Sequence, residues 1–361
     1  MTPATEAELA EVIRAGTGPM LVRGGGTRSI DHRQGAVIRT TGLSGIELYE
    51  PGALTLVARA GTPLAEVEAT LAAEGQRLPF EVPDMRGLLG TAGESTIGGV
   101  VAANASGPRR VQAGACRDSL IGVRFVNGEG TVIKNGGRVM KNVTGYDLVK
   151  LLAGSWGQLG VLTEVSFKVL PTPETTATLV LHGLSDAQAV AAMSAALGSP
   201  YEVSGAAHLP GQGTVLRIEG FANSVAYRAG RLRQHLAAFG SVDHMDGPQV
   251  WADVRDLRPF HGAEGDVWKL SVKPSDAPAL LVRAGAEAHL MDWGGGLIWL
   301  RMAPGSDLRA RLGAFDGHAT RVRGSDPSVP VFHPEPPALA GLMDGIRRKF
   351  DPRGLFSGLA A

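Results

Sequence analysis

The chain has 361 residues with 35 basic and 35 acidic side chains, so its formal net charge is +0 and no broad positive field attracts nucleic acid or an anionic membrane. Hydrophobic residues make up 44% and charged residues 19%, which excludes a disordered chain and indicates a well-buried globular one. The length exceeds that of a usual single core, so we expect two domains.

The single cysteine, Cys116, excludes an internal disulfide, an iron–sulfur cluster and a cysteine-based zinc site within this chain. We expect Cys116 to be a small buried residue rather than a redox group. Residues 1–18 lack the basic and apolar regions of a signal peptide, and no later run approaches ~20 apolar residues. We therefore expect a cytoplasmic chain that does not span a membrane by itself and holds no metal.

Short strands and glycine-rich loops alternate in the first half of the chain. An amphipathic helix over 5–15 precedes a strand at 20–22, which runs into the sequence R-G-G-G-T-R at 23–28. Two further strands are expected at 37–39 and 54–59. Thr62 and Pro63 then predict the N-cap and first position of a helix that ends near Gly75.

The next segment, 90–114, consists mostly of Gly, Ala, Ser and Asn and surrounds a short helix that includes T-I-G-G at 96–99. Two strands at 120–126 and 130–134 flank Asn127 and Gly128, a pair typical of a hairpin turn. A helix over 146–153 and a strand over 161–170 follow. The sequence Pro-Thr-Pro at 171–173 marks the expected domain boundary.

Beyond this boundary the pattern of strands and helices is βαββαβ, and it occurs twice. The first set is expected at 175–182, 186–198, 201–208, 213–220, 224–239 and 242–246, with Ser185 and Asn223 as N-caps. The second set is expected at 267–272, 276–285, 287–291, 296–302, 306–315 and 317–322. This order is that of a ferredoxin-like unit, so two such units side by side are predicted. A final helix is expected over 338–350.

The two glycine segments are suited to binding an anion. Consecutive glycines after a strand let several backbone N–H groups point into one concavity, where a diphosphate can bind. The chain has 50 glycines, about twice the average usage, which indicates that its backbone closely approaches a ligand or another segment. No long helix follows the glycine run and no G-K-[ST] sequence occurs, so neither a Rossmann motif nor a P-loop is present.

Four sequence stretches carry a family resemblance. These are R-G-G-G-T-R at 23–28, T-I-G-G at 96–99, K-N-V-T-G-Y-D-L at 141–148 and G-Q-L-G-V-L-T-E at 157–164. Through them, residues 20–171 resemble the FAD-binding domain of the vanillyl-alcohol oxidase and p-cresol methylhydroxylase (PCMH) superfamily. The segments 266–272, 292–299 and 350–356 resemble the E-type subunits of bacterial glycolate oxidases.

The resemblance implies an α+β, two-domain PCMH-type FAD-binding fold with a ferredoxin-like second domain. The implied domains are an FAD-binding domain over 1–171, a cap or substrate domain over 172–335, and a C-terminal segment, 336–361, that returns to the first. The implied cofactor contacts are Arg23, Gly24, Gly25, Gly26, Thr27, Arg28, Gly93, Thr96, Ile97, Gly98, Gly99, Ser106, Gly107, Gly160 and Val161. Thr27 stands where some members carry a histidine linked to the flavin, so FAD is expected to be non-covalent.

Within this list, residues 24–28 and 96–99 are implied to contact the diphosphate. Ser106 and Gly107 are implied to approach the flavin ring, and Gly160 and Val161 to meet the adenosine through their backbone.

Oxidation of a 2-hydroxy acid needs a base for the hydroxyl proton, a hydride acceptor and a cation for the carboxylate. Flavin supplies the acceptor, and the other groups are expected in the second domain. The candidates are Arg255, Arg258, His261, Trp268 and Lys269. Four of the five tryptophans, at 251, 268, 293 and 299, occur in the same part of the chain. They line a site or simply pack the domain core.

The function that the resemblance implies is that of an FAD-binding subunit of a complex that oxidises glycolate to glyoxylate and passes electrons to a partner. The implied partners are a D-type flavoprotein and an iron–sulfur subunit, with membrane association only through them. No His-x-His sequence, which the related D-type subunits carry, occurs here. Two alternatives stay open: a self-sufficient FAD-dependent oxidase or dehydrogenase of another hydroxy acid or alcohol, and a non-catalytic flavin-fold scaffold.

Overall fold

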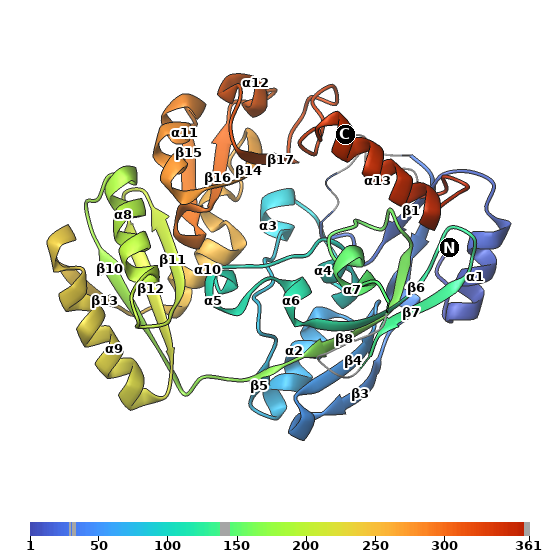
Figure 1. Ribbon diagram of the computed structural model, residues 1–361, viewed down its shortest axis with the longest axis horizontal. Helices are drawn as coiled ribbons and strands as arrows, with labels where there is room; N and C mark the ends of the chain where they lie inside the picture. Colours follow the sequence, from blue (N-terminus) through green and yellow to red (C-terminus); the bar gives the residue numbers. More distant parts are fainter. Residues whose placement is uncertain (29, 31–33, 138–144, 357–361) are drawn as a thin grey trace. The chain divides into compact units, whose positions relative to one another are not determined.

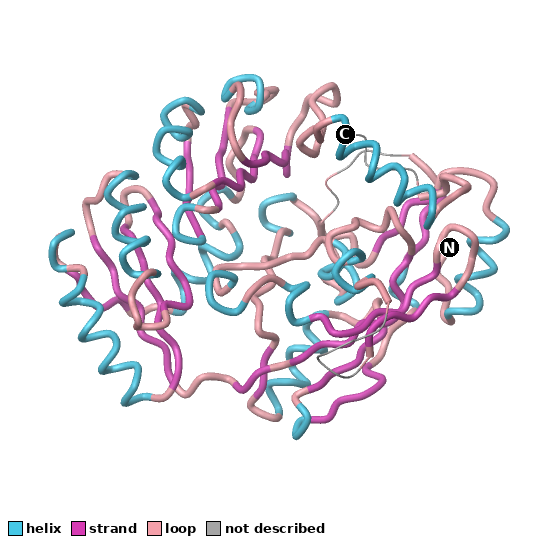
Figure 2. Tube along the Cα trace, viewed as in Figure 1, coloured by secondary structure: helices cyan, strands magenta, loops and turns pink. Residues whose placement is uncertain are grey.

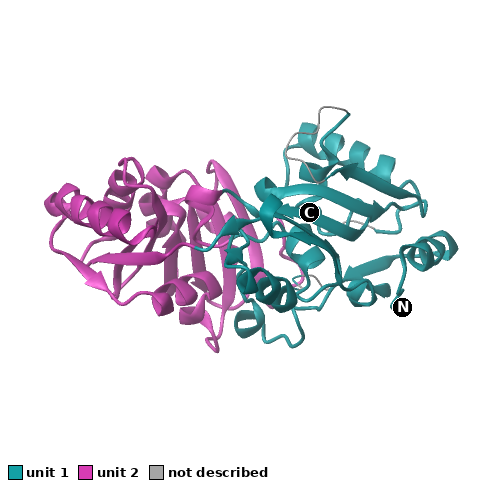
Figure 3. Ribbon diagram, turned by 90° about the horizontal axis from the view of Figure 1, so that it is seen from below, with its two compact units in different colours: residues 1–106, 114–172, 334–361 teal, residues 107–113, 173–333 magenta. Residues whose placement is uncertain are grey.

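A computed structural model describes residues 1–28, 30, 34–137 and 145–356 (Figure 1). Part of the K-N-V-T-G-Y-D-L stretch, residues 141–144, therefore lies outside the described residues. The chain forms two compact units, coloured separately in Figure 3. Unit 1 comprises Met1–Ser106, Gly114–Thr172 and Pro334–Ala361, and unit 2 comprises Gly107–Ala113 and Pro173–His333.

The centre of unit 1 is a five-stranded antiparallel sheet in the order β3-β4-β8-β6-β7. Its strands are β3 (Ile46–Glu50), β4 (Thr55–Arg59), β6 (Leu120–Val126), β7 (Val132–Gly136) and β8 (Val161–Lys168). Phe125, Val165 and Phe167 from the central strands have no exposed surface and form the core with the helices that cover the sheet. The other elements of this part of unit 1 are α2 (Leu64–Ala73), α3 (Arg86–Leu89), α4 (Ile97–Ala102), α6 (Cys116–Ser119), α7 (Leu148–Leu152), α13 (Pro337–Phe350), β5 (Gln76–Arg77) and β9 (Leu170–Pro171).

A second, smaller core in unit 1 joins the two ends of the chain. Helix α1 (Glu6–Ala15) and the parallel strands β1 (Met20–Arg23) and β2 (Ala36–Arg39) pack here against Leu355 and Phe356. The Asp351 carboxylate accepts hydrogen bonds from the N–H groups of Leu355 and Phe356, at 3.0 and 2.7 Å. The Leu355 carbonyl in turn accepts one from Met20 N–H at 2.7 Å. The C-terminal segment therefore holds β1 in place, directly before the glycine run.

Unit 2 is an eight-stranded antiparallel sheet in the order β13-β10-β12-β11-β15-β16-β14-β17, covered by helices (Figure 2). The first half contains β10 (Thr175–Leu181), α8 (Asp186–Leu197), β11 (Val203–Leu209), β12 (Gly213–Gly220), α9 (Ala222–His235) and β13 (Val242–Met245). After α10 (Pro248–Asp256), the second half contains β14 (Asp266–Val272), α11 (Ala277–Ala284), β15 (Ala288–Asp292), β16 (Leu297–Met302), α12 (Leu308–Leu312) and β17 (Gly317–Arg323).

Each half has the ferredoxin-like order in which the first and third strands lie in the middle, and the halves join where His208 on β11 pairs with Met291 on β15. The predicted α+β fold with a ferredoxin-like second part is confirmed.

A short segment departs from the expected range 1–171 of the first domain. Gly107–Ala113, which includes α5 (Arg110–Ala113), belongs to unit 2. The buried Arg109 guanidinium binds Glu219 on β12 through two hydrogen bonds of 3.0 Å. Burial alone raises the pKa of Glu219, but the hydrogen bond from Arg109 and the charge of Arg217 hold it well below its usual range. This buried ion pair binds the segment 107–113 to strand β12, although the two are far apart in the sequence.

Three local predictions were wrong for identifiable reasons. The Thr62 hydroxyl binds Gly45 and the Arg59 carbonyl, so it does not cap α2, whose N-cap is Pro63. The N-cap of α9 is Phe221 rather than Asn223. In the β6–β7 turn the Asn127 carboxamide accepts from Glu129 and Thr131 N–H, and the positive φ occurs at Gly130. Strand β3 and helix α10 were not predicted.

Candidate functional site

Unit 1 contains a groove between the glycine run and the loop that precedes β8. It encloses about 930 Å³ of space, counting its open side. Its lining residues are Leu21, Val22, Arg23, Gly24, Gly25, Gly26, Thr27, Arg28, Thr40, Ala60, Thr96, Gly98, Gly99, Ala102, Ser155, Trp156, Gly157, Gly160 and Leu162.

The glycines of this groove are required by close packing. A Cβ on Gly25 would lie 1.5 Å from the Glu94 carbonyl oxygen, and one on Gly24 would lie 2.2 Å from Thr96 Oγ1. Gly26 has a φ of +77°, which L side chains rarely adopt. In the described part of the chain, no backbone hydrogen bond occupies the N–H groups of Gly25 and Gly26. The run is therefore a backbone cradle whose donors can serve an anionic ligand such as a diphosphate.

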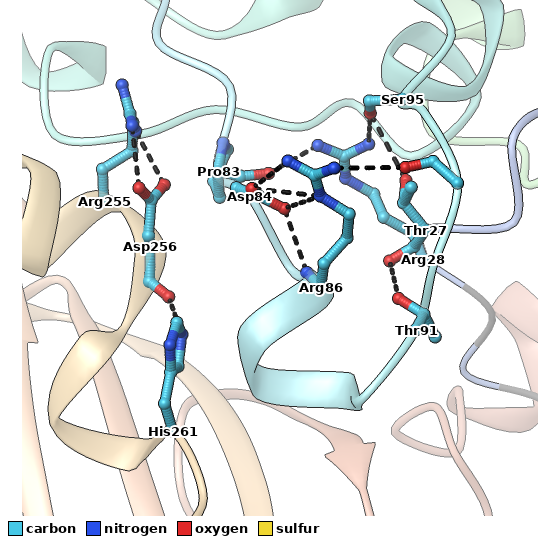
Figure 4. A network of polar contacts seen from close by, with 11 residues as sticks. Thr27, Arg28, Pro83, Asp84, Arg86, Thr91, Ser95, Arg255, Asp256 and His261 are labelled. Atoms are coloured by element: carbon cyan, nitrogen blue, oxygen red, sulfur yellow. Dashed lines mark hydrogen bonds and ion pairs between the residues drawn. The ribbon is translucent and has the colours of Figure 1, made fainter.

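Arg28 supplies a cation at the wall of this groove (Figure 4). Its guanidinium donates to Ser95 Oγ and, at 2.6 Å, to the Pro83 carbonyl oxygen. The nearby Asp84 carboxylate is bound at 2.7 Å by Arg86. Burial lowers the pKa of Arg28 to about 10, and the charge of Asp84 offsets this only in part. The positive charge of Arg28 is thus incompletely neutralised by the protein and suits a phosphate ligand.

The structure divides the fifteen predicted cofactor residues into two groups. Ten of them line the groove: Arg23, Gly24, Gly25, Gly26, Thr27, Arg28, Thr96, Gly98, Gly99 and Gly160. The other five are placed elsewhere: Gly93, Ile97, Ser106, Gly107 and Val161.

These five have identifiable surroundings. Ile97 and Val161 have no exposed surface, and Ile97 N–H donates to the Thr62 carbonyl oxygen. Gly93 packs against the glycine run, because a Cβ added to it would lie 2.4 Å from the Gly25 carbonyl oxygen. Ser106 Oγ accepts from Cys116 N–H, and Gly107 belongs to unit 2.

Nine lining residues were not predicted from the sequence. They are Leu21, Val22, Thr40, Ala60, Ala102, Ser155, Trp156, Gly157 and Leu162. Most are apolar residues next to the glycine loops or at the ends of β4 and β8. Leu21 and Val22, in the strand that leads into the glycine run, were within reach of sequence reasoning. Thr40 and Ala60 carried no sequence signal, because their approach depends on how the strands pack.

Of the second-half candidates, three have their polar groups paired within unit 2, and a fourth, Trp268, is buried. Arg255 forms two 2.7 Å hydrogen bonds with the carboxylate of its neighbour Asp256, and His261 Nε2 lies 2.8 Å from the Asp256 carbonyl oxygen (Figure 4). Arg258 pairs with Asp253 at 3.5 Å. Trp268 has no exposed surface and lies in the core under the Arg309 guanidinium.

Lys269 is in a different environment. Its Nζ lies 5.6 Å from the ring centre of Trp293 and 5.9 Å from that of Trp299, and the Arg110 guanidinium stacks on the same Trp293 ring at 4.4 Å. Trp293 Nε1 donates to the Gly107 carbonyl oxygen at 3.1 Å, which fixes the ring. Burial and the charge of Arg110 lower the pKa of Lys269 to about 8.

Within the described chain, no carboxylate pairs with Lys269. Two cations and a fixed indole therefore form a cluster suited to a small anion.

Cys116 has no exposed surface, and burial raises the pKa of its thiol well above the usual range, so it is an inert buried thiol as expected. Among the residues that the structure describes, no group of three His, Cys, Asp or Glu side chains is placed to hold a metal ion. No helix in the same residues has the length and apolar character needed to cross a membrane.

Comparisons with known proteins agree with this geometry. A family model described as an FAD-binding domain matches residues 1–136. Glycolate oxidase subunit GlcE of Escherichia coli (strain K12) is 34% identical over 94% of this chain and 91% of that protein. Glycolate oxidase subunit GlcD of Bacillus subtilis (strain 168) is 45% identical over 86 residues, which are 24% of this chain and 18% of that protein.

The fold also matches a solved structure. Alkyldihydroxyacetonephosphate synthase aligns with a TM-score of 0.71 at 15% identity, over 98% of this chain and 76% of that one. The fold and the matched family model thus define a protein with an FAD-binding domain. Within this class, the chain belongs to the family of the glycolate oxidase subunit GlcE.

Proposed function

We propose that the chain is the FAD-binding subunit of a multi-subunit complex that oxidises glycolate, or a closely related 2-hydroxy acid, to the 2-oxo acid. The glycine cradle beside Arg28 supports this proposal most directly, because it matches a dinucleotide diphosphate in shape and charge. The relatedness to GlcE over nearly the whole chain points to glycolate oxidation. Bound FAD supplies the two-electron acceptor for hydride from the CH–OH carbon.

The cradle residues and Arg28 hold the cofactor in this proposal, and the attachment is non-covalent. Thr27 is 5% exposed, and its hydroxyl lies 3.4 Å from Ser95 Oγ. A threonine at this position offers no ring nitrogen for a bond to the flavin. Purified protein precipitated with acid is expected to release all of its FAD into the supernatant. Yellow colour retained in the pellet would refute non-covalent attachment.

The Lys269 cluster is proposed as the site for the anionic group of a hydroxy acid in unit 2. Arg110 and Lys269 provide the positive charge, and both contact the ring of Trp293, which lies beside each of them. Arg255, Arg258 and His261 are less favoured candidates, because contacts within unit 2 occupy their functional groups, and Trp268 is less favoured because it is fully buried. Lys269→Met is expected to weaken glycolate binding in calorimetric titrations. The exposed cation Lys273 offers a matched control, Lys273→Met.

The proposed partners are a D-type flavoprotein and an iron–sulfur subunit, and they place the complex on the cytoplasmic face of the membrane. The relatedness to two glycolate oxidase subunits supports a multi-subunit assembly. A relay of electrons through iron and sulfur has to come from a partner, since Cys116 is buried and has no second cysteine to pair with.

A decisive experiment compares the purified chain alone with the chain co-expressed with a D-type flavoprotein and an iron–sulfur subunit. The chain alone is expected to show flavin absorbance near 450 nm that glycolate bleaches slowly, and the assembly to turn over. Rapid bleaching of the isolated chain by glycolate would instead support a self-sufficient dehydrogenase. A colourless chain that cannot be reconstituted with FAD would support a scaffold role.

A further inference from the structure

The fifth tryptophan of the chain, Trp156, lines the cofactor groove and is held in an unfavourable backbone conformation. Its φ is +53°, in the left-handed region. Gly154 and Gly157, on either side, also have positive φ, at +88° and +77°. In this loop the left-handed turns are therefore made by glycine except at position 156. A bulky aromatic residue is unfavourable there, so its ring is expected to serve a function.

The backbone of the loop is fixed on both sides of Trp156. Trp156 N–H donates to the Ala102 carbonyl oxygen at 2.9 Å, and Gly154 N–H donates to the Val101 carbonyl oxygen at 3.0 Å, both at the end of α4. A Cβ on Gly157 would lie 3.2 Å from the Cβ of Val22. The loop therefore rests between α4 and β1, and the position of Trp156 at the groove is set by unit 1 alone.

Three groove residues are apolar and buried: Leu21 on β1, Leu162 on β8 and Ala60 directly after β4. Leu21, Ala60 and Leu162 are 6%, 1% and 6% exposed. Such a wall suits a flat aromatic ring that needs no access to substrate. The isoalloxazine ring has to meet a hydride donor and an electron partner, whereas adenine has to meet neither. Adenine is therefore the part of FAD that these apolar side chains suit best.

We propose that Trp156 is a positioning residue whose indole stacks on the adenosine end of FAD. This inference rests on FAD binding by the groove and adds the residue that selects an adenine dinucleotide. Tryptophan offers the largest stacking surface of any side chain, and Trp156 lines the groove.

The test measures binding of FAD and of ADP to apoprotein prepared by removing the flavin with concentrated bromide. Trp156→Gly removes the ring and keeps a residue that favours the left-handed conformation. We expect it to weaken both FAD and ADP binding by about 10- to 100-fold. Trp156→Phe is expected to stay within about threefold of the natural protein, because a smaller ring still stacks. ADP should quench part of the tryptophan fluorescence of the natural protein, but not of Trp156→Phe.

Glu202→Gly is the matched control. Glu202 has a φ of +50° in unit 2 and an exposed side chain, so this change also replaces a left-handed residue by glycine. Its affinities for FAD and ADP should not change. If Trp156→Gly does not fold, as judged by its melting curve, Trp156→Asn replaces it, because asparagine tolerates the left-handed region.

Three results would overturn the proposal. The first is unchanged FAD affinity in Trp156→Gly. The second is weaker FAD binding with unchanged ADP binding, which would place the ring on the flavin. The third is ADP quenching that persists in Trp156→Phe. A natural protein that binds no FAD at all would contradict the proposed function itself, so the two failures are distinguishable.

Discussion

Arg28→Gln removes the positive charge from the wall of the groove and leaves a shorter, neutral amide. The pKa of Arg28 falls from 12.5 to about 10 mainly because the side chain is buried. This shift corresponds to roughly 3 kcal/mol by which the free protein disfavours the charged form. A diphosphate next to the guanidinium can recover this energy, and a neutral glutamine cannot. We therefore expect Arg28→Gln to weaken FAD binding by about 100-fold.

The same change has an opposite effect on the apoprotein. The lowered pKa means that the folded chain binds the Arg28 proton less tightly than the unfolded chain does. The charged side chain therefore lowers the free energy of unfolding at every pH below about 10, where it is protonated in both states. Removing the charge therefore leaves the melting temperature of the apoprotein unchanged or higher, while it lowers that of the FAD-bound protein. Fluorescence titration with FAD and thermal melting with and without FAD measure both effects.

Arg86→Gln is the control for Arg28→Gln. Arg86 is about half exposed and already pairs with Asp84 at 2.7 Å, so its loss should change FAD affinity by less than about twofold. An Arg28→Gln dissociation constant within threefold of that of the natural protein would refute the electrostatic role of Arg28.

Three further outcomes are expected. Gly25→Ala should abolish measurable FAD binding, because its Cβ has no room beside Glu94, whereas Gly52→Ala, where the added carbon meets nothing within 4 Å, should bind FAD normally. Glycolate affinity should fall as the pH rises above about 8, because Lys269 then loses the proton that binds the anion, and this pH dependence should vanish in Lys269→Met. Glu219→Gln should lower the free energy of unfolding in urea by about 3–5 kcal/mol, since it removes the buried negative charge that Arg109 and Arg217 contact. The exposed Glu47→Gln should cost less than about 1 kcal/mol, and equal losses for the two glutamates would contradict this account.

Much of the fold could be predicted from the sequence, because its signals are local. Alternation of apolar residues and the positions of Ser185 and the prolines indicated both βαββαβ halves of unit 2. The glycine run between β1 and Thr27 was recognisable because consecutive glycines have few roles other than close backbone approach. Strand β3 was missed because it is short, and helix α10 because its residue pattern was not told apart from that of the loops around it.

The sequence by itself determined the glycine cradle, the cation Arg28 beside it and the class of cofactor. Only the tertiary structure decided that Ile97 and Val161 are buried while Trp156 lines the groove, and that Arg110 joins Lys269 on the two sides of Trp293. Local backbone preference is encoded by neighbouring residues, so a motif reveals it. Which side chains meet across 50 or 150 residues depends on how the strands and loops pack, and no local pattern contains that information.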